Sequence, residues 1–327
     1  MYSWGNDEST WKNPGGYQFD DAPYLKKVAD EVKTKGITER TYSTNLGPDM
    51  GLVDPKGKVI RSESKNPIIF GVDGTMSMQS WPGEIFDRLP LFYKTLAQYR
   101  ADVEVSFSVV GDAKWDDWAL QVADFGKGTV LDDHLKALYA EGRGGPGLEE
   151  SYGLWAHFMN TQVETPNAEK PILFLACDEM FYKTVDPAHI KKYLGVDSQA
   201  ISGEEAIQEL TENYDVFLLR KQFGRGKDDR ILDRWHKAID PQRIVSISAD
   251  DEIRAVDIAM GIVANRWGNN SDFSKNIGAR QDLETIDTVM ESVRAASQYI
   301  PGSSESVMFG GSAALLKSSK LLIGGEK

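Results

Sequence analysis

From Asn66 onwards the sequence alternates short apolar segments with segments of helical periodicity, and this alternation restricts the possible folds more than any other feature. The apolar segments are rich in β-branched and aromatic residues, which is typical of strands buried on both faces of a sheet. We predict strands over residues 67–72, 103–110, 118–124, 171–177, 215–222 and 243–248. Helical periodicity predicts helices over residues 82–100, 129–140, 148–161, 187–194, 203–213, 228–239 and 251–266. The two alternating patterns together indicate an α/β protein.

The lengths of the connections predict the directions of the strands. Only the residues from Gly111 to about Asp117 separate the second strand from the third, which is too short for a crossover helix, so these strands should pair antiparallel. Every other connection contains a helix, which predicts parallel strands with right-handed crossovers. We therefore expect a Rossmann-like, doubly wound, mainly parallel six-stranded sheet with one antiparallel edge strand and helices on both faces. Pro90 lies inside the first helix and should kink or divide it.

Turn-forming residues surround this α/β region on both sides. The chain divides into an N-terminal extension, a doubly wound domain, a segment with a C-terminal helix and a Gly/Ser-rich tail, over residues 1–65, 66–268, 269–300 and 301–327. Within the extension, the pattern predicts a short helix over 23–34 and a small hairpin over 53–59. After Gly268 a polar loop should lead to an amphipathic helix over 280–299.

Composition narrows the class of protein further. The chain has 327 residues, of which 41 % are hydrophobic, and a net charge of −13. Such a charge argues against binding a nucleic acid backbone and suits the binding of cations or of basic partners. Cys177 is the single cysteine, so no disulfide can form within the chain, and its apolar surroundings predict a small buried side chain. Neither a signal peptide nor a membrane-spanning segment is evident in the sequence, so we expect a cytoplasmic protein that does not bind membranes.

Oxygen-bearing side chains follow the first strand at alternating positions. Asp73, Thr75 and Ser77 lie in an extended loop directly after the strand over 67–72. Alternation in an extended segment lets these side chains converge on one point, and hard cations such as Mg²⁺ prefer oxygen ligands. Ligands in open α/β folds bind at the carboxyl ends of the strands, which is where this loop lies.

Two further loops should lie at the same edge of the sheet. One runs over residues 142–151, enters the helix over 148–161 and carries Glu149 and Ser151. The other follows the strand over 171–177 and begins with Asp178. Three loops with oxygen side chains at one edge support the hypothesis of a metal site.

The segment Asp73-Gly74-Thr75-Met76-Ser77-Met78, together with Asp178 after the fourth strand, resembles the von Willebrand factor type A (VWA) family with its metal-ion-dependent adhesion site. The resemblance covers about residues 66–268 and is to members of the intracellular bacterial or phage type. It implies that Thr75 and Ser77 bind Mg²⁺, or Mn²⁺ or Ca²⁺ in its place, directly. It also implies that Asp73 and Asp178 act through water or orient the hydroxyls.

The sequence departs from the family pattern at two places. The family usually supplies a threonine from the second of its three site loops, which here is the loop over residues 142–151 and is called the middle loop below. This chain has Pro146 at that position, so Glu149 and Ser151 are candidate substitutes. Met76 stands between the two hydroxyl residues, where the family usually has glycine.

The resemblance implies metal-dependent protein binding rather than catalysis. A partner's Asp or Glu would complete the shell of the cation, and intracellular bacterial members of the family often work with MoxR-type AAA+ ATPases in complex assembly. A second hypothesis is structural: the extension and the tail pack on the domain or reach neighbouring copies in a homo-oligomer, sheath or particle. The metal site would then be vestigial.

Enzymatic alternatives have less support in the sequence. The segment Val72-Asp73-Gly74-Thr75 is similar to the first motif of haloacid dehalogenase-like phosphohydrolases, with Asp250 and Asp251 as a later metal-binding pair. That motif places its nucleophilic aspartate where this chain has Gly71, so no aspartyl-phosphate can form.

Two other sequence features are weaker evidence for a function, one for nucleotide binding and one for partner binding. The glycines of residues 142–147 fit a dinucleotide fingerprint only formally, because a helix rather than a strand precedes them. Trp115 and Trp118 belong to the expected hairpin and are the aromatic residues best placed to face a partner.

Overall fold

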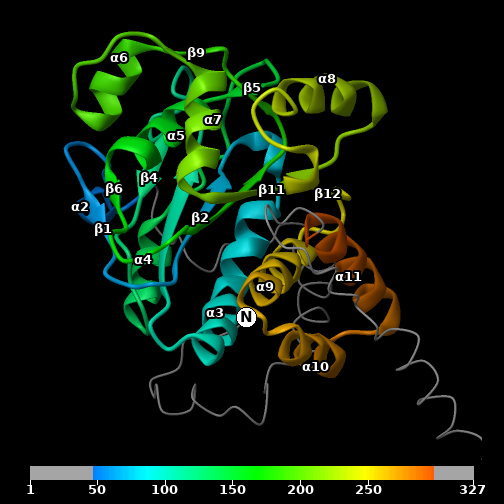
Figure 1. Cartoon of the computed structure of the whole chain (residues 1–327). Coiled ribbons are helices and arrows are strands. Elements are labelled where there is room, and N and C mark those ends of the chain that lie inside the picture. Colours follow the sequence, from blue (N-terminus) through cyan, green and yellow to red (C-terminus); the bar gives the residue numbers. More distant parts are fainter. Residues whose placement is uncertain (1–46, 298–327) are drawn as a thin grey trace, which may run out of the picture. The chain divides into compact units, whose positions relative to one another are not determined.

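A central six-stranded sheet organises the computed structural model, which describes residues 47–297 (Figure 1). Its strands are β2 (Pro67–Asp73), β3 (Glu104–Val110), β4 (Leu120–Val122), β7 (Ile172–Cys177), β11 (Asp215–Lys221) and β12 (Ile244–Ile247). They lie in the order β12-β11-β7-β2-β3-β4. All neighbours pair parallel except β3 and β4, which pair antiparallel at one edge. The predicted mainly parallel sheet with one antiparallel edge strand is confirmed.

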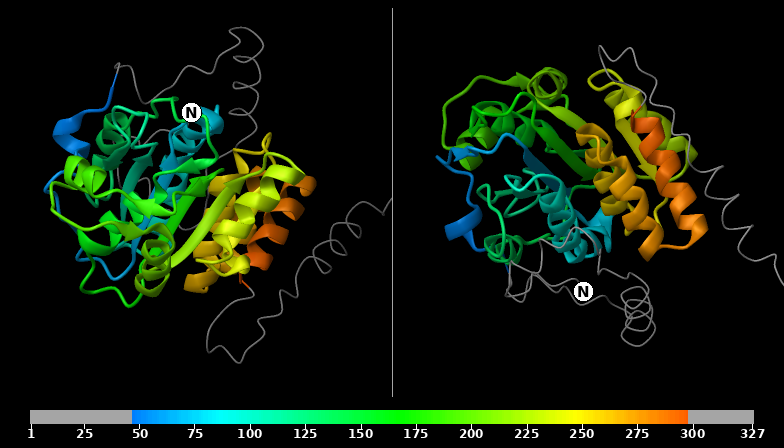
Figure 2. Two further views of the ribbon diagram at one scale, coloured as in Figure 1. Left: turned by 90° about the horizontal axis from the view of Figure 1, so that it is seen from above. Right: turned by 60° about the horizontal axis from the view of Figure 1, so that its bottom comes forward.

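Helices cover both faces of this sheet. One face carries α3 (Trp81–Tyr99), α4 (Val130–Ala137), α9 (Arg254–Trp267), α10 (Asn270–Arg280) and α11 (Leu283–Ser297). The other carries α5 (Tyr152–Thr161), α7 (Gly203–Asn213) and α8 (Arg225–Trp235). Figure 2 shows α9 and α11, in gold and orange, side by side. Since successive side chains of a strand point to opposite faces, Phe70 and Ile69 of β2 enter different cores.

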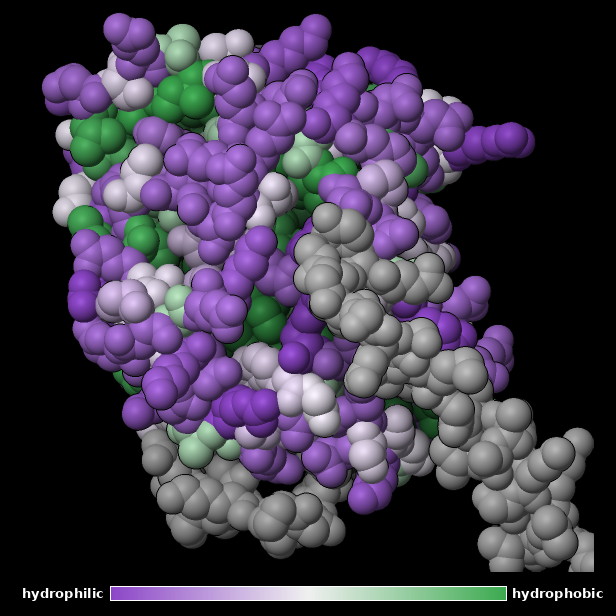
Figure 3. Space-filling view, in the orientation of Figure 1, coloured by the Kyte–Doolittle hydropathy of each residue, from purple (hydrophilic) through white to green (hydrophobic). Residues whose placement is uncertain are grey.

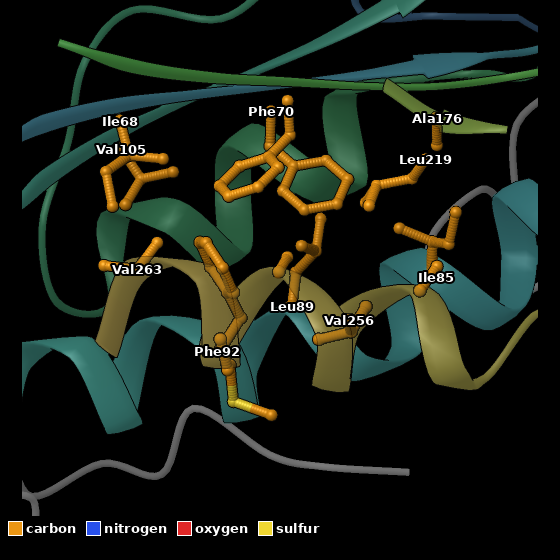
Figure 4. Close-up of a cluster of buried hydrophobic side chains, with 14 of the residues drawn as sticks. Ile68, Phe70, Ile85, Leu89, Phe92, Val105, Ala176, Leu219, Val256 and Val263 are labelled. Atoms are coloured by element: carbon orange, nitrogen blue, oxygen red, sulfur yellow. The ribbon is translucent and has the colours of Figure 1, made fainter. Parts of the chain in front are cut away.

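The core beneath α3 and α9 is built around aromatic side chains. Figure 4 shows side chains of the sheet, including Phe70 and Leu219, meeting Phe92 of α3 and Val256 of α9. The Phe70 and Phe92 rings meet edge to face with their centroids 5.5 Å apart. Full burial of such a side chain contributes roughly 1.5–3 kcal/mol, so this core holds the helices firmly on the sheet.

The opposite core explains the glycine at the position of the phosphohydrolase nucleophile. A Cβ atom on Gly71 would lie 2.8 Å from the Trp155 ring of α5. The indole N–H of Trp155 donates a hydrogen bond to the Ser108 hydroxyl at 2.9 Å. Gly71 therefore lets a buried tryptophan pack against β2, and its role is in packing.

Short elements complete the fold. They are α2 (Met50–Val53), β1 (Ile60–Arg61), β5 (Glu149–Glu150), β6 (Val163–Glu164), β8 (Met180–Phe181), β9 (Thr184–Val185), α6 (Pro187–His189), a π-helical turn (Ile190–Leu194), β10 (Ile201–Ser202) and 3-10 turns at Met76–Met78 and Pro241–Arg243. No helix among residues 47–297 is long and apolar enough to span a lipid bilayer.

Three local expectations differ from the structure. The hairpin predicted over 53–59 does not form, because α2 ends at Val53 and β1 pairs in parallel with β6 instead. The expected polar loop after Gly268 is the helix α10, whose Phe273 and Ile277 are buried. Pro90 does not divide α3, since packing of the buried helix on both sides of the proline compensates for one lost backbone hydrogen bond. The helix predicted over 23–34 and the tail over 301–327 lie outside the described residues.

Candidate functional site

The sheet brings four of the predicted site residues together. Asp73 is the last residue of β2, and Asp178 directly follows the neighbouring strand β7. Thr75 and Ser77 belong to the turn between β2 and α3. Because parallel neighbours end at the same edge, the two strand ends place the four side chains side by side.

A chain of hydrogen bonds joins these side chains. The Thr75 hydroxyl donates to Asp73 Oδ1 at 2.7 Å, and the Ser77 hydroxyl donates to Asp178 Oδ1 at 3.1 Å. The two hydroxyl oxygens lie 3.1 Å apart. This contact is also within hydrogen-bond distance and either hydroxyl can be its donor, so two hydroxyl protons are shared among three contacts. Such an arrangement suits a cation between or beside the hydroxyls.

Both oxygens of Asp73 are already engaged. Besides the hydroxyl, Oδ1 accepts the backbone N–H of Thr75 at 2.7 Å, and Oδ2 accepts the phenol O–H of Tyr152. Burial and the nearby Asp73 charge raise the pKa of Tyr152, so the phenol keeps its proton and remains a donor. Asp73 is thus held as an orienting group. Tyr152 was not among the predicted site residues, because a tyrosine on an apolar helix face resembles an ordinary core residue.

The middle loop approaches the site through its backbone. The N–H of Gly142 donates to the carbonyl of Gly74 at 2.8 Å, and the N–H of Met76 donates to the carbonyl of Arg143 at 2.6 Å. Gly144 has φ +116°, and a Cβ atom there would lie 3.2 Å from Thr75 Cβ. The glycines of this loop therefore permit a close approach that side chains would block.

The two candidate substitutes from this loop point to other partners. Glu149 Oε1 lies 3.2 Å from Nη1 of Arg234 on α8. The Ser151 hydroxyl oxygen accepts the backbone N–H of Ala113 at 2.9 Å. Neither joins the hydrogen-bonded chain from Asp73 to Asp178.

Glu150, between them, is the acidic residue that turns inward. It is buried, its Oε2 has no hydrogen-bond partner within residues 47–297, and a Cβ on Gly144 would lie 3.3 Å from its Oε1. Burial and the charge of Asp73 raise the pKa of Glu150 to about 12. Burial and Asp73 likewise raise the pKa of Glu179 to about 7. Glu150 is therefore protonated at neutral pH.

The site concentrates negative charge away from water. Burial raises the pKa of Asp73, and burial together with Asp73 raises the pKa of Asp178. The ammonium group of Lys221, at the end of β11, donates to the backbone carbonyl of Ser77. Burial lowers the pKa of Lys221, while Asp178 opposes that shift. Lys221 thus supplies part of the positive charge that the carboxylates need, and its place at a strand end is the signal that could have identified it.

The residues at this edge fit a hard divalent cation. Asp178 Oδ2 is buried without a hydrogen-bond partner among the described residues, and the facing hydroxyls supply two further oxygens. No group of three or more His, Cys, Asp or Glu side chains in residues 47–297 is arranged to hold a metal. Any cation here would therefore depend on the hydroxyls of Thr75 and Ser77.

Exposed apolar side chains flank the acidic residues. Met76 is 68 % exposed and lies in the turn itself, whereas Trp115 is 56 % exposed and lies in the β3–β4 hairpin. A Cβ on Gly145 would lie 2.5 Å from the indole nitrogen of Trp115, so the ring lies against the middle loop. Trp118 instead packs edge to face on Tyr139. Cys177 is buried, as predicted.

No protein-family model matches the sequence, and no curated protein matches it. Among solved structures, the chain is similar to the pilus adhesin SpaC from Lactobacillus rhamnosus GG, at 13 % identity and a TM-score of 0.43. It is also similar to proximal thread matrix protein 1 from the mussel byssus, at 10 % identity and a TM-score of 0.42. The matched regions cover 67 % and 62 % of this chain, and only 32 % and 48 % of those proteins.

A third solved structure consists of a VWA domain. The SpRpn10 VWA domain matches at 11 % identity and a TM-score of 0.35, over 59 % of this chain and 94 % of that domain. These similarities do not assign the chain to a family.

Proposed function

We propose that this chain is a cation-dependent protein-interaction module of the VWA type. The observation that carries the proposal is the hydrogen-bonded chain from Asp73 through Thr75 and Ser77 to Asp178, with its two hydroxyl oxygens 3.1 Å apart. The order of the strands and the antiparallel edge hairpin agree with what the resemblance implies.

In this proposal Thr75 and Ser77 hold Mg²⁺, or Mn²⁺ or Ca²⁺, through their hydroxyl oxygens. Asp73 and Asp178 orient the hydroxyls, and Tyr152 fixes the carboxylate of Asp73. When bound, the cation supplies a positive charge that accepts a carboxylate from a partner. Without it, buried carboxylates lie near one another, and their raised pKa values reflect burial and mutual repulsion. Partner binding would therefore be switchable by the cation.

The proposed partner is a protein that offers an Asp or Glu side chain. Exposed methionine and aromatic residues are enriched at protein interfaces, and Met76 and Trp115 flank the acidic residues. A MoxR-type AAA+ ATPase in the cytoplasm is one partner that the family resemblance suggests. We propose no catalytic role, since the position of a nucleophilic aspartate is Gly71 under the Trp155 ring.

Isothermal titration calorimetry with Mg²⁺ and Mn²⁺ tests the cation site. We expect saturable binding to the wild-type chain and none to Asp73→Ala. Glu169→Ala is the matched control, because Glu169 is exposed and precedes β7 at the opposite edge of the sheet. Equal binding to wild type and to Asp73→Ala would refute the assignment of these residues.

A structural role with a vestigial site is the second candidate. The observation that favours it is the ammonium group of Lys221, which already places a positive charge beside Ser77 and near Asp178. This candidate predicts no heat of binding for either cation and a chain that self-associates with or without them.

A further inference from the structure

A basic pocket lies beside the candidate cation site. Its volume is about 420 Å³, and its lining includes Lys114, Lys183, Arg230 and Arg234, with Glu149 and Tyr182 between them. Four cationic side chains around one pocket are unusual in a chain whose net charge is −13. The positive charge of these side chains would attract an anion to the pocket, although the rest of the chain is acidic.

Three separate segments contribute the basic side chains of the pocket. Arg230 and Arg234 lie one turn apart on α8, and Lys183 lies between β8 and β9. Lys114 comes from the β3–β4 hairpin, where its ammonium group lies 3.4 Å from the centre of the Tyr182 ring. Figure 1 shows β5, β9 and α8 at one end of the fold. The basic side chains are therefore brought together by the tertiary structure.

Most of this positive charge is not neutralised by neighbouring residues. Glu149 forms an ion pair with Arg234 at 3.2 Å. Lys183 and Arg230 are exposed, and neither side chain has a hydrogen-bond or ion-pair partner within residues 47–297. With one carboxylate against four cations, the lining keeps an excess of positive charge that a ligand can use.

The pocket and the candidate cation site use the same segment after β7. Its lining residue Met180 lies two residues after Asp178 and pairs with Glu149 in the β5–β8 ladder. The phenol of Tyr182 donates to Asp112 Oδ2 at 2.9 Å. Asp178 is thus two residues from the pocket lining, near enough for one partner to contact both.

We propose that this basic pocket binds a second acidic segment of the same partner protein. This inference rests on the proposed function, because it assumes a partner whose first carboxylate meets the cation. The pocket is open and its free cations are exposed, which suits neighbouring Asp or Glu side chains of a peptide. The Arg230 guanidinium can bind a carboxylate through two parallel hydrogen bonds, and Lys183 adds a mobile positive charge.

The test uses the intact chain, EDTA and a fluorescent hexaglutamate peptide, so that no divalent cation contributes. Fluorescence anisotropy should show binding to the wild type, weakening as salt is raised. The double variant Lys183→Glu with Arg230→Glu should lose affinity by about tenfold or more, as expected for reversing two charges at a binding site. The control is Lys127→Glu with Lys275→Glu, two exposed lysines on the β4–α4 loop and on α10, whose affinity should stay within about twofold of the wild type.

Other outcomes would overturn the inference. Absence of peptide binding to the wild type, or an equal loss in the pocket and control variants, would show that the pocket does not recognise acidic segments. Displacement of the peptide by equimolar inorganic phosphate would show that the pocket takes a small anion instead.

The two proposals fail separately. If Asp73→Ala loses Mg²⁺ binding but keeps peptide binding in EDTA, and the pocket variant loses the peptide, both stand. If the wild type binds no cation while the pocket variant alone loses the peptide, the cation site fails and the pocket stands as an acidic-segment site. If the pocket variant binds both Mg²⁺ and the peptide normally, only the pocket fails.

Discussion

The protons of two hydroxyls decide the chemistry of the candidate site. Thr75 and Ser77 each lie within hydrogen-bond distance of a carboxylate, and their oxygens lie 3.1 Å apart, where either hydroxyl can donate to the other. Two protons therefore serve three contacts, and a cation beside the two oxygens would leave both protons to the carboxylates. The same logic applies to Asp178, whose Oδ2 is buried and has no partner among residues 47–297. Substitutions here should therefore have opposite effects on the cation-free and the cation-bound protein.

Asp178→Asn tests this opposition. The amide keeps the acceptor for Ser77 but removes a buried charge whose pKa is raised by burial and by Asp73. In EDTA, we expect the variant to be at least as stable to urea as the wild type. With Mg²⁺ at about 100 times its Kd, linkage should stabilise the wild type by about 2.7 kcal/mol and the variant not at all. Equal stabilisation of both by Mg²⁺ would contradict the assignment of Asp178.

Tyr152→Phe tests the support of Asp73. The substitution removes the O–H that Asp73 Oδ2 accepts and leaves a buried carboxylate oxygen without a donor. We expect the free energy of unfolding in EDTA to fall by about 1–3 kcal/mol. Tyr214→Phe is the comparison, since the Tyr214 hydroxyl donates to the neutral carbonyl of Met159 and its loss should cost about 1 kcal/mol. A smaller loss for Tyr152→Phe than for Tyr214→Phe would show that Asp73 does not depend on this bond.

At the scale of elements, one buried carboxylate connects three helices. Asp257 of α9 lies 3.1 Å from Arg88 of α3, 3.1 Å from Arg254 and 3.0 Å from Arg280 of α10. Arg88, Arg280 and Asp257 are all buried. Buried charges are tolerated only when they are paired, so this cluster fixes how α3, α9 and α10 pack.

Asp257→Asn should be strongly destabilising. It leaves buried arginines without this carboxylate, and breaking a buried pair in this way costs about 3–5 kcal/mol at pH 7. Urea unfolding measures the loss, and Asp132→Asn is the control, because its pair with Lys136 is largely exposed and should contribute less than about 1 kcal/mol. Similar losses in both variants would argue against a structural role for the cluster.

The stability difference between the wild type and Asp257→Asn should depend on pH through the pKa of Asp257. Burial acts to raise this pKa, but Arg280, Arg88 and Arg254 outweigh it and hold it below the usual range. A depressed pKa contributes stability above about pH 4, the value in the unfolded chain, and this contribution is lost as the pH falls through the folded value. The wild type should therefore lose more stability between pH 5 and acid unfolding than Asp257→Asn does.

The middle loop offers a matched pair of glycines. A Cβ on Gly144 would meet Thr75 at 3.2 Å and the φ of +116° disfavours any side chain, whereas Gly142, at φ +69°, has nothing within 4 Å. We expect Gly144→Ala to weaken Mg²⁺ binding by about tenfold or more, as for the loss of other groups that orient ligands. Gly142→Ala should cost about 1 kcal/mol of stability and leave the affinity unchanged. Calorimetry distinguishes them, and unchanged affinity in both would mean that the loop does not shape the site.

The sequence predicted the strands and helices well because their periodicity reflects burial. β7 was expected over 171–177 and is Ile172–Cys177, while α7 was expected over 203–213 and is Gly203–Asn213. The helix α10 was missed, since its polar composition hides two buried residues, Phe273 and Ile277. Pattern reasoning therefore worked where a whole face is apolar and failed where two side chains anchor a polar helix.

The candidate site was predictable in part for the same kind of reason. Asp73, Thr75, Ser77 and Asp178 follow strand ends, so topology alone brings them together. The short strand β5 decides which side chain of the middle loop turns inward. It buries Glu150 and turns Glu149 toward Arg234. Tyr152 and Lys221 contribute through contacts between elements, which no local pattern specifies.

At the scale of the whole molecule, negative and positive side chains gather at different places. A chain with a net charge of −13 places buried carboxylates at one edge of its sheet and four basic side chains around a pocket whose lining includes Met180, two residues after Asp178. In the two proposals above, negative charge at one site would attract a cation, and positive charge at the other would attract an acidic segment. A partner with two spaced acidic groups would satisfy both, and recognition would then have a direction along the edge of the sheet.

The size of the intact chain in solution decides between an interaction module and an assembly component. Exposed large apolar side chains among residues 47–297 are few and come from separate elements, for example Leu52, Val130 and Leu283. Figure 3 shows hydrophilic side chains over most of one face, with hydrophobic ones in small separate areas. Obligate interfaces need a larger contiguous apolar surface than this. Light scattering should therefore give a mass near 36.4 kDa, with and without Mg²⁺. A multiple of that mass that disappears when residues 1–46 and 298–327 are removed would favour self-assembly through the terminal segments.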